Sequence, residues 1–144
     1  MEACWLWHGT PHGNRMARVG VGVDCVQFVN EILVASGVVE RMPFGGYSVD
    51  AGLHIPSTKI QGVIERALFV QTVAAADAQF GDIAVFKNGT RSAHVGLVGE
   101  KVVWHALANQ FVTRSQFSLW KHEIETLYRL TSIGWRINPQ EAMA

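Results

Sequence analysis

The hydrophobic pattern of this 144-residue chain changes its period once, close to residue 69. Before that point, apolar residues recur at the spacing of a helix face, in one segment from Cys25 to about Gly37 and another that begins at Thr58. After it come five short segments rich in strand-forming residues, with turns at Gly81-Asp82 and Asn88-Gly89: Phe69–Val73, Ile83–Lys87, Ala93–Val98, Val102–Ala106 and Leu127–Ile133. Helices followed by strands predict an α+β fold with an antiparallel sheet.

Composition and charge fit one domain of ordinary size that covers residues 1–144. Hydrophobic residues make up 49% of the chain, which is enough for a core, and no linker or internal repeat divides it. Lys and Arg together number 12, as do Asp and Glu, so the formal net charge is zero. We therefore expect no nucleic-acid partner, because such binding needs an excess of positive charge.

The N-terminal segment, Met1 to Trp7, lacks the basic start and apolar core of a signal peptide. No stretch of the sequence is long enough to span a bilayer, so we expect a soluble chain without membrane insertion that is cytoplasmic when made. Only two cysteines occur, which excludes a disulfide framework beyond a single bridge. Cys4, close to the N-terminus, is interpreted as structural or incidental.

Cys25 stands where a helix is predicted to begin, after a glycine-rich approach at residues 20–22. Asp24 is a good N-cap residue and Gln27 follows three positions later, which predicts a capping box. The partial positive charge of a helix start favours thiolate over thiol, and the thiolate is the form that attacks carbonyl carbon. A buried cysteine that only fills space is the competing interpretation. A histidine base close to Cys25 would favour the nucleophile.

A predicted hairpin later in the chain carries two histidines, His94 and His105. If residues 100–101 form its loop, Gly96 opposes His105, and both histidines lie on one face, diagonal to each other. Gly96 then leaves the space between them empty. In this arrangement His94 takes the proton of Cys25 while His105 fixes its tautomer and orientation, as in a triad of nucleophile, base and orienting group.

Four motifs in this order resemble those of the NlpC/p60 family of papain-like cell-wall cysteine peptidases, and the match covers most of the chain. They are the upstream turn Gly9-Thr10-Pro11, the nucleophile motif Val23-Asp24-Cys25, the strand-start motif Gly81–Phe86 and the base motif His94-Val95-Gly96, and Val103–Ala106 fits the third site. The compact build and the region of Trp120 and Tyr128-Arg129 are also similar to the short phage-borne branch of the family. The resemblance implies a papain-like fold, with N-terminal helices packed on a central antiparallel β-sheet.

The resemblance also implies an activity: hydrolysis of an amide in peptidoglycan stem peptides, typically between the side-chain carboxyl of D-glutamate and diaminopimelate or lysine. Cys25 would form an acyl-enzyme, His94 would act first as base and then as acid, and His105 would orient it. The backbone N–H of Cys25 is the natural oxyanion donor, because a helix start leaves its first N–H groups without an intrahelical acceptor. No metal or organic cofactor is implied.

The chain departs from the family pattern at three of the positions expected to line the substrate site. The family commonly has serine and glycine after the cysteine, where this chain has Val26 and Gln27, and tyrosine after the Gly-Thr-Pro turn, where it has His12. The loss of a hydroxyl and the different reach of His12 affect specificity. Together with Asp24 and Gly96, these residues are the predicted substrate-binding set.

Six histidines raise the question of a metal site, but the sequence lacks paired cysteines and the His-Glu-x-x-His spacing, so no metal is expected. Three hypotheses of different classes stay open. The first is a peptidoglycan peptidase, virion-associated as part of a phage tail or delivered as a toxin to the periplasm or cell wall, with an immunity-protein partner. The second is a catalytically weak structural member of a tail or envelope assembly. The third is a thiol acyltransferase that passes the acyl group to an amine or hydroxyl.

Overall fold

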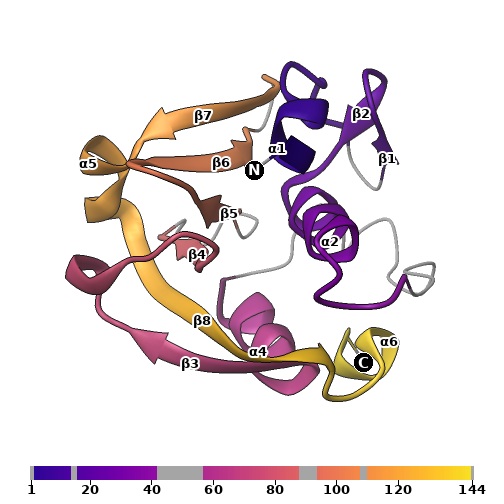
Figure 1. Cartoon of the computed structure of the whole chain (residues 1–144), viewed down its shortest axis with the longest axis vertical. Helices are drawn as coiled ribbons and strands as arrows, with labels where there is room; N and C mark the ends of the chain where they lie inside the picture. Colours follow the sequence, from indigo (N-terminus) through magenta and orange to yellow (C-terminus); the bar gives the residue numbers. More distant parts are fainter. Residues whose placement is uncertain (1, 14–15, 42–56, 88–93, 108–109, 144) are drawn as a thin grey trace.

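The computed structural model describes residues 2–13, 16–41, 57–87, 94–107 and 110–143 (Figure 1). A six-stranded antiparallel sheet in the order β3-β8-β4-β5-β6-β7 forms its centre, so the predicted α+β class is confirmed. The sheet consists of β3 (Leu68–Val73), β4 (Ile83–Phe86), β5 (His94–Val98), β6 (Val102–Ala106), β7 (Val112–Gln116) and β8 (Ile124–Trp135). The other elements are α1 (Glu2–Trp7), α2 (Cys25–Ala35), α4 (Ser57–Ala67), α5 (Phe117–Trp120), α6 (Pro139–Met143), the short strands β1 (Ala17–Arg18) and β2 (Gly22–Val23), and the 3₁₀ turns η1 (Ala75–Asp77) and η2 (Lys121–Glu123).

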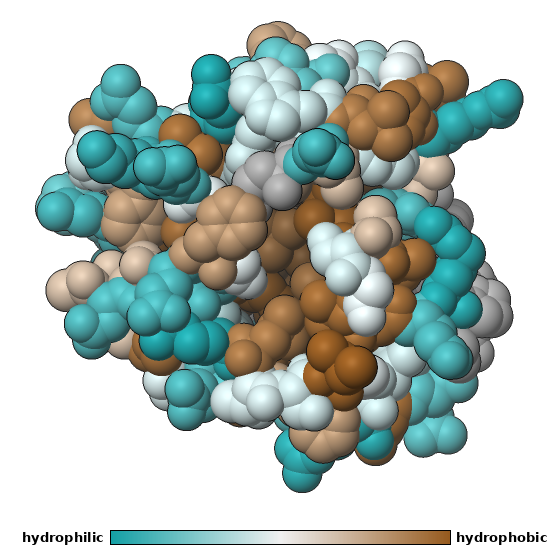
Figure 2. Space-filling model, viewed as in Figure 1, coloured by the Kyte–Doolittle hydropathy of each residue, from teal (hydrophilic) through white to brown (hydrophobic). Residues whose placement is uncertain are grey.

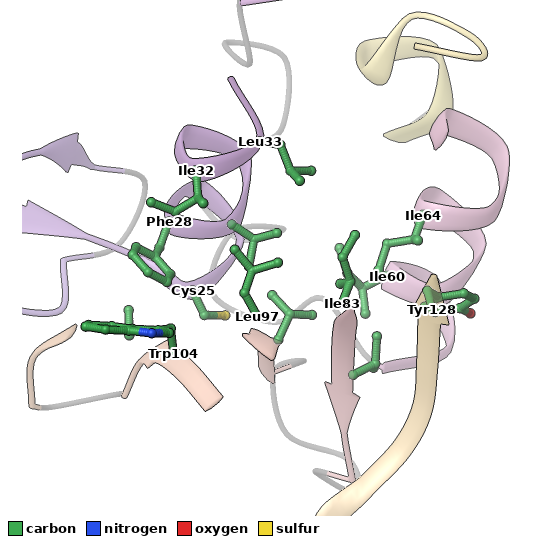
Figure 3. Packing of buried hydrophobic residues seen from close by; sticks show 14 of the residues in the cluster. Cys25, Phe28, Ile32, Leu33, Ile60, Ile64, Ile83, Leu97, Trp104 and Tyr128 are labelled. Carbon is green, nitrogen blue, oxygen red and sulfur yellow. The ribbon is translucent and has the colours of Figure 1, made fainter. Parts of the chain in front are cut away.

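Alternation along the strands divides the core between the two faces of the sheet. Ile83 and Val85 of β4 pack in the main cluster, which includes the apolar faces of α2 and α4 (Figure 3). Ala84 and Phe86 point the other way, into a smaller cluster that α5 covers. Strand side chains alternate in this way because their period is two. The N-terminal helices therefore pack on one face of the sheet, as the resemblance implied.

An apolar cavity of about 60 Å³ lies between α2, α4 and the sheet. Figure 2 shows a hollow with apolar walls in this region. Its lining includes Val26 of α2, Ile60 and Ile64 of α4, and Ile83 and Val95 of the sheet. The wall formed by Val26 and Val95 is next to the start of α2, so the main core reaches up to the residue at which that helix begins.

The predicted elements agree best with the structure where their sequence pattern is regular. The predicted strand Val102–Ala106 matches β6 at both ends, and the helix predicted from Thr58 begins one residue earlier, at Ser57. The last strand is longer than predicted and runs over Ile124–Trp135, with a bulge on each side, because it pairs with both β3 and β4. The predicted turn Asn88-Gly89 lies outside the described residues, as does most of the irregular segment between Val38 and Pro56.

Residues 9–13 connect the far edge of the sheet to the start of α2. The N–H of Gly9 donates to the carbonyl of Val112 (2.9 Å), and the N–H of His12 donates to that of Gln110 (2.9 Å). On the other side of this segment, the carbonyl of Pro11 accepts a hydrogen bond from the N–H of Val23 (3.0 Å). Val23 is two residues before Cys25. His12 is therefore held between β7 and the N-terminus of α2.

Candidate active site

The helix α2 begins at Cys25, as its sequence pattern predicts. Asp24 is extended (φ −90°, ψ 170°), and its Oδ1 accepts the backbone N–H of Gln27 at 2.7 Å, which confirms the N-cap half of the predicted capping box. The helix ends at Ala35, and Gly37 follows in the left-handed region (φ +75°), where glycine is favoured. Asp24 thus fixes the start of the helix, and with it the position of the thiol.

The hairpin of β5 and β6 has the predicted register. Leu97 pairs with Trp104 and Val98 with Val103, and the N–H of Gly99 donates to the carbonyl of Val102 at 2.8 Å. Trp104 packs in the main core on the α2 side, which confirms that it faces away from His105. When this register is continued by one more residue pair, Gly96 lies opposite His105.

Gly96 is required by the close approach of β6. A Cβ at this position would lie 2.8 Å from the backbone oxygen of Trp104 and 3.1 Å from the Cβ of His105. We expect Gly96→Ala to lower the free energy of unfolding by about 1–3 kcal/mol, because backbone atoms have to move to admit the methyl group. Urea denaturation measures this.

Gly62→Ala is the matched control for that substitution. In α4 the added Cβ would meet only the tip of the Arg66 side chain, at 2.9 Å, whose guanidinium also donates to the carbonyl of Ala142. Alanine also has the higher helix propensity, so this variant should be more stable by about 0.5–1 kcal/mol. If Gly96→Ala were as stable as the unsubstituted protein, the close approach of the two strands would be contradicted.

The two histidines form a hydrogen-bonded pair. His94 Nε2 lies 2.8 Å from His105 Nδ1, and the ring centroids are 4.9 Å apart. Phe86 lies 5.1 Å from the His94 ring, and Trp120 of α5 meets the His105 ring edge-on at 4.7 Å. These aromatic rings cover the pair on the α5 face of the sheet. Because His94 Nε2 is bonded to His105, Nδ1 is the ring nitrogen of His94 that can interact with another group.

Burial keeps both imidazoles neutral. Desolvation lowers the pKa of His94 to about 4, helped by the nearby His12, and it lowers the pKa of His105 to about 3, helped by His94. Each neutral ring carries one N–H and one lone pair. A single hydrogen bond between the rings therefore requires one ring to donate and the other to accept.

These depressed pKa values predict a loss of stability in acid. An unfolded histidine titrates near 6.5, so between 6.5 and about 4 the unfolded chain binds protons that the folded His94 does not. The free energy of unfolding should therefore fall as the pH drops through this range, by about 1.4 kcal/mol per pH unit for each proton. Urea denaturation at a series of pH values measures the slope, and His94→Gln should make it shallower. An unchanged slope in that variant would contradict the burial of His94.

The thiol of Cys25 lies where β5 and β6 separate. Their pairing ends at Leu97 and Trp104, and the next amide of β5 directed toward β6 is that of Val95. The thiol interacts with this N–H and with the N–H groups of Cys25 and Val26. Figure 3 shows the Cys25 side chain extending from α2 toward the strand that carries Leu97. The nucleophile candidate is thus next to Val95, whose neighbour in sequence is His94.

The expectation that the helix start would keep Cys25 as a thiolate is wrong for the structure at rest. Burial and, to a smaller extent, the charge of Asp24 outweigh the three backbone N–H groups, which lower the pKa of the thiol, and together they raise it to about 12. With His94 neutral above about pH 4, the resting site at neutral pH holds a thiol and a neutral imidazole. The thiolate has to form during the reaction, by transfer of its proton to a base.

The predicted substrate-binding residues occupy different environments. His12 is partly exposed and close enough to Asp24 and His94 for their charges to interact. Burial lowers its pKa, and Asp24 partly offsets that effect. Val26 lines the apolar cavity, and Gln27 is buried with its backbone N–H on Asp24. The structure therefore brings His12 and Asp24 to the site by their side chains, whereas Val26 contributes its backbone N–H.

Sequence reasoning did not assign two residues of the site, Trp120 and Ser115. Trp120 covers the histidine pair, and Ser115 Oγ lies 2.8 Å from His105 Nε2. Among the described residues, no group of three or more His, Cys, Asp or Glu side chains is arranged to hold a metal ion. Within the same ranges, no helix has the length and apolar character needed to cross a membrane.

Comparison with solved structures identifies the fold as that of NlpC/p60 domains. The NlpC/p60 domain of the peptidoglycan hydrolase SagA has a TM-score of 0.57 and 17% identity, over 90% of this chain and 94% of that one. A protein of Staphylococcus aureus described as similar to lipoprotein, NLP/P60 family, has a TM-score of 0.61 and 17% identity, and this chain spans only 39% of its length. By sequence, no family model and no curated protein matches the chain.

Proposed function

We propose that this chain is a cysteine peptidase of the NlpC/p60 type that hydrolyses peptidoglycan stem peptides. The observation that carries the proposal is the hydrogen-bonded pair of His94 and His105, together with the thiol at the start of α2 that meets the backbone N–H of Val95, the residue after His94. A solved domain with the same fold belongs to a peptidoglycan hydrolase. The fold and these three side chains together favour acyl transfer through Cys25.

In the proposed reaction His94 Nδ1 is the base, because Nε2 is bonded to His105. The proton of the Cys25 thiol moves to Nδ1 as sulfur forms a bond to the carbonyl carbon. The C–N bond then breaks, and the same proton passes to the leaving amine. Water attacks the carbonyl carbon of the resulting thioester and gives a proton to His94. The C–S bond then breaks, the carboxylic acid is released, and His94 returns the proton to sulfur. His105 holds the base ring in position throughout.

The carbonyl oxygen gains negative charge in both steps, and the start of α2 can stabilise it. The backbone N–H of Cys25 is one of the groups that a helix start leaves without an intrahelical acceptor. A fixed donor aimed at the developing charge is an effective catalytic device. We assign this N–H as the oxyanion donor, and no metal or organic cofactor takes part in the proposed reaction.

The proposed bond is the one between the side-chain carboxyl of D-glutamate and diaminopimelate. In this proposal His12 and Asp24 contact the substrate, and Gly96 leaves room for it beside the histidines. Val26 and Gln27 also line the substrate site, at positions where the family commonly has other residues. The partial exposure of His12 and its closeness to His94 support this role. Its imidazole offers a hydrogen bond in place of the phenol that the family commonly has there.

Digestion of purified peptidoglycan followed by mass spectrometry tests the proposal. We expect fragments with a new amino terminus on diaminopimelate or lysine and a free D-glutamate carboxyl. Adding an amine acceptor separates hydrolysis from acyl transfer, because a transferase would attach the amine to the acyl fragment. If no product forms and an alkylating reagent leaves Cys25 unmodified, a structural role in a tail or envelope assembly would replace the peptidase.

The proposed substrate lies in the cell wall, outside the compartment in which the chain is made. Delivery as part of a phage tail and delivery as a toxin with an immunity protein are the two routes we propose. Neighbouring genes for tail components would support the first route, and a neighbouring immunity gene would support the second.

A further inference from the structure

A third polar side chain continues the histidine pair. His105 Nδ1 faces His94 Nε2, and its other nitrogen, Nε2, lies 2.8 Å from Ser115 Oγ. The three residues come from β5, β6 and β7, which are neighbours in the sheet. His105 pairs with Thr113 and Val103 pairs with Ser115, so Ser115 lies diagonally from His105 on the same face. The side chains form a line of hydrogen bonds across three strands.

The direction of these hydrogen bonds decides whether His94 can act as a base. To accept a proton at Nδ1, a neutral His94 must carry its own N–H at Nε2 and donate it to His105 Nδ1. His105 must then carry its N–H at Nε2, where Ser115 Oγ is the acceptor. In the reverse direction Ser115 donates, His105 carries its N–H at Nδ1, and His94 is protonated at Nδ1, where it cannot accept the thiol proton.

Burial makes the acceptor at Ser115 important. His105 is fully buried, and Ser115 Oγ is the acceptor that the structure provides for an N–H at its Nε2. A buried N–H without a partner is unfavourable, and a buried imidazole can avoid it by moving the proton to its other nitrogen. That change would reverse the hydrogen bond to His94. The low pKa values of both rings agree with this account, because they keep the rings neutral and leave the choice of tautomer open.

We propose that Ser115 is a positioning residue that holds His105 in the Nε2–H tautomer and thereby keeps the Nδ1 lone pair of His94 available to the thiol. This role rests on the proposed function of Cys25 and His94. Ser115 acts through His105 and does not touch the reacting atoms. Ser115 lies on the edge strand β7. Through His105 on β6, it decides which ring nitrogen of His94 on β5 carries the proton.

Kinetics of three variants on stem peptides test the proposal. Ser115→Ala should lower kcat by about tenfold with KM unchanged, which corresponds to the loss of one hydrogen bond in a buried network. Ser115→Thr keeps the hydroxyl and should restore kcat. Thr113→Ala is the matched control: it removes a hydroxyl from the same face of β7 at the residue that pairs with His105, and should leave kcat unchanged.

Nitrogen NMR of protein with ¹⁵N-labelled histidine provides a readout that does not depend on activity. In the unsubstituted protein both His94 and His105 should carry their N–H at Nε2, and Ser115→Ala should shift the His105 signals toward the Nδ1–H form. His105→Gln assigns the signals. Circular dichroism and thermal unfolding of each variant check that the fold is kept.

The outcomes for Ser115 and for the proposed function can be distinguished. If the unsubstituted protein cleaves no peptidoglycan, the proposed function fails. The histidine tautomers measured by NMR still test whether Ser115 sets the tautomer of His105. The role of Ser115 is overturned if His105 carries its N–H at Nδ1 in the unsubstituted protein, or if Ser115→Ala leaves the tautomers unchanged. It is also overturned if Thr113→Ala lowers kcat as much as Ser115→Ala, because a purely structural effect of β7 would then account for both.

Discussion

Cys25→Ala should reduce peptidoglycan hydrolysis to the background rate while the fold is kept. Without sulfur no thioester can form, and the histidine pair has no nucleophile to deprotonate. The substitution removes one small atom from the end of a side chain in the first turn of α2, and Asp24 still caps the helix through the N–H of Gln27. The release of stem-peptide fragments measures activity, and circular dichroism checks the fold.

Cys4→Ala is the matched control for this prediction. Cys4 is buried like Cys25, neither cysteine forms a disulfide, and burial raises the pKa of Cys4 to about 11. Cys4 belongs to α1, whereas the thiol of Cys25 meets the backbone N–H of Val95. The Cys4 variant should retain activity. Equal rates in Cys25→Ala and the unsubstituted protein would contradict the acyl-enzyme mechanism.

His94→Ala should lower kcat/KM by about 10²–10⁴, the usual contribution of a general base. The effect should lie at the upper end of this range, because burial keeps Cys25 as a thiol with a pKa of about 12, and another route to the thiolate is unfavourable. His105→Ala should cost less, since the base itself remains and loses only the partner that holds its orientation and tautomer. Steady-state kinetics on a soluble stem peptide measure both variants.

His122→Ala is the control for the histidine variants, because His122 is an exposed histidine of η2. Its kcat/KM should equal that of the unsubstituted protein. A smaller loss in His94→Ala than in His105→Ala would contradict the assigned roles and would favour His105 as the base.

The sequence was sufficient to predict the parts of the site that depend on local patterns. The start of α2 follows from an N-cap residue before a regular apolar period, and the structure confirms both. The register of the β5–β6 hairpin follows from its short loop, and it brings His94 and His105 within hydrogen-bond distance. In both cases the residues that decide the geometry are close together in the sequence.

The residues that sequence reasoning missed depend on the tertiary arrangement. β7 is an edge strand whose only fully buried residue is Val112, so it lacks the alternation of apolar residues that identifies a strand. No local pattern in the sequence therefore points to Ser115. The pKa of Cys25 is predicted in the wrong direction for a similar reason: the helix start is visible in the sequence, but the burial of the thiol is not.

The most direct test of the central claim is the reaction of the protein with an activated aryl ester of the D-glutamate side-chain carboxyl. An activated ester makes acylation fast, so the acyl-enzyme should accumulate. We predict a burst of one equivalent of the aryl alcohol for each protein molecule, and an acyl adduct that peptide mapping assigns to Cys25. Turnover without an adduct on Cys25, or the same turnover by Cys25→Ala, would contradict the account.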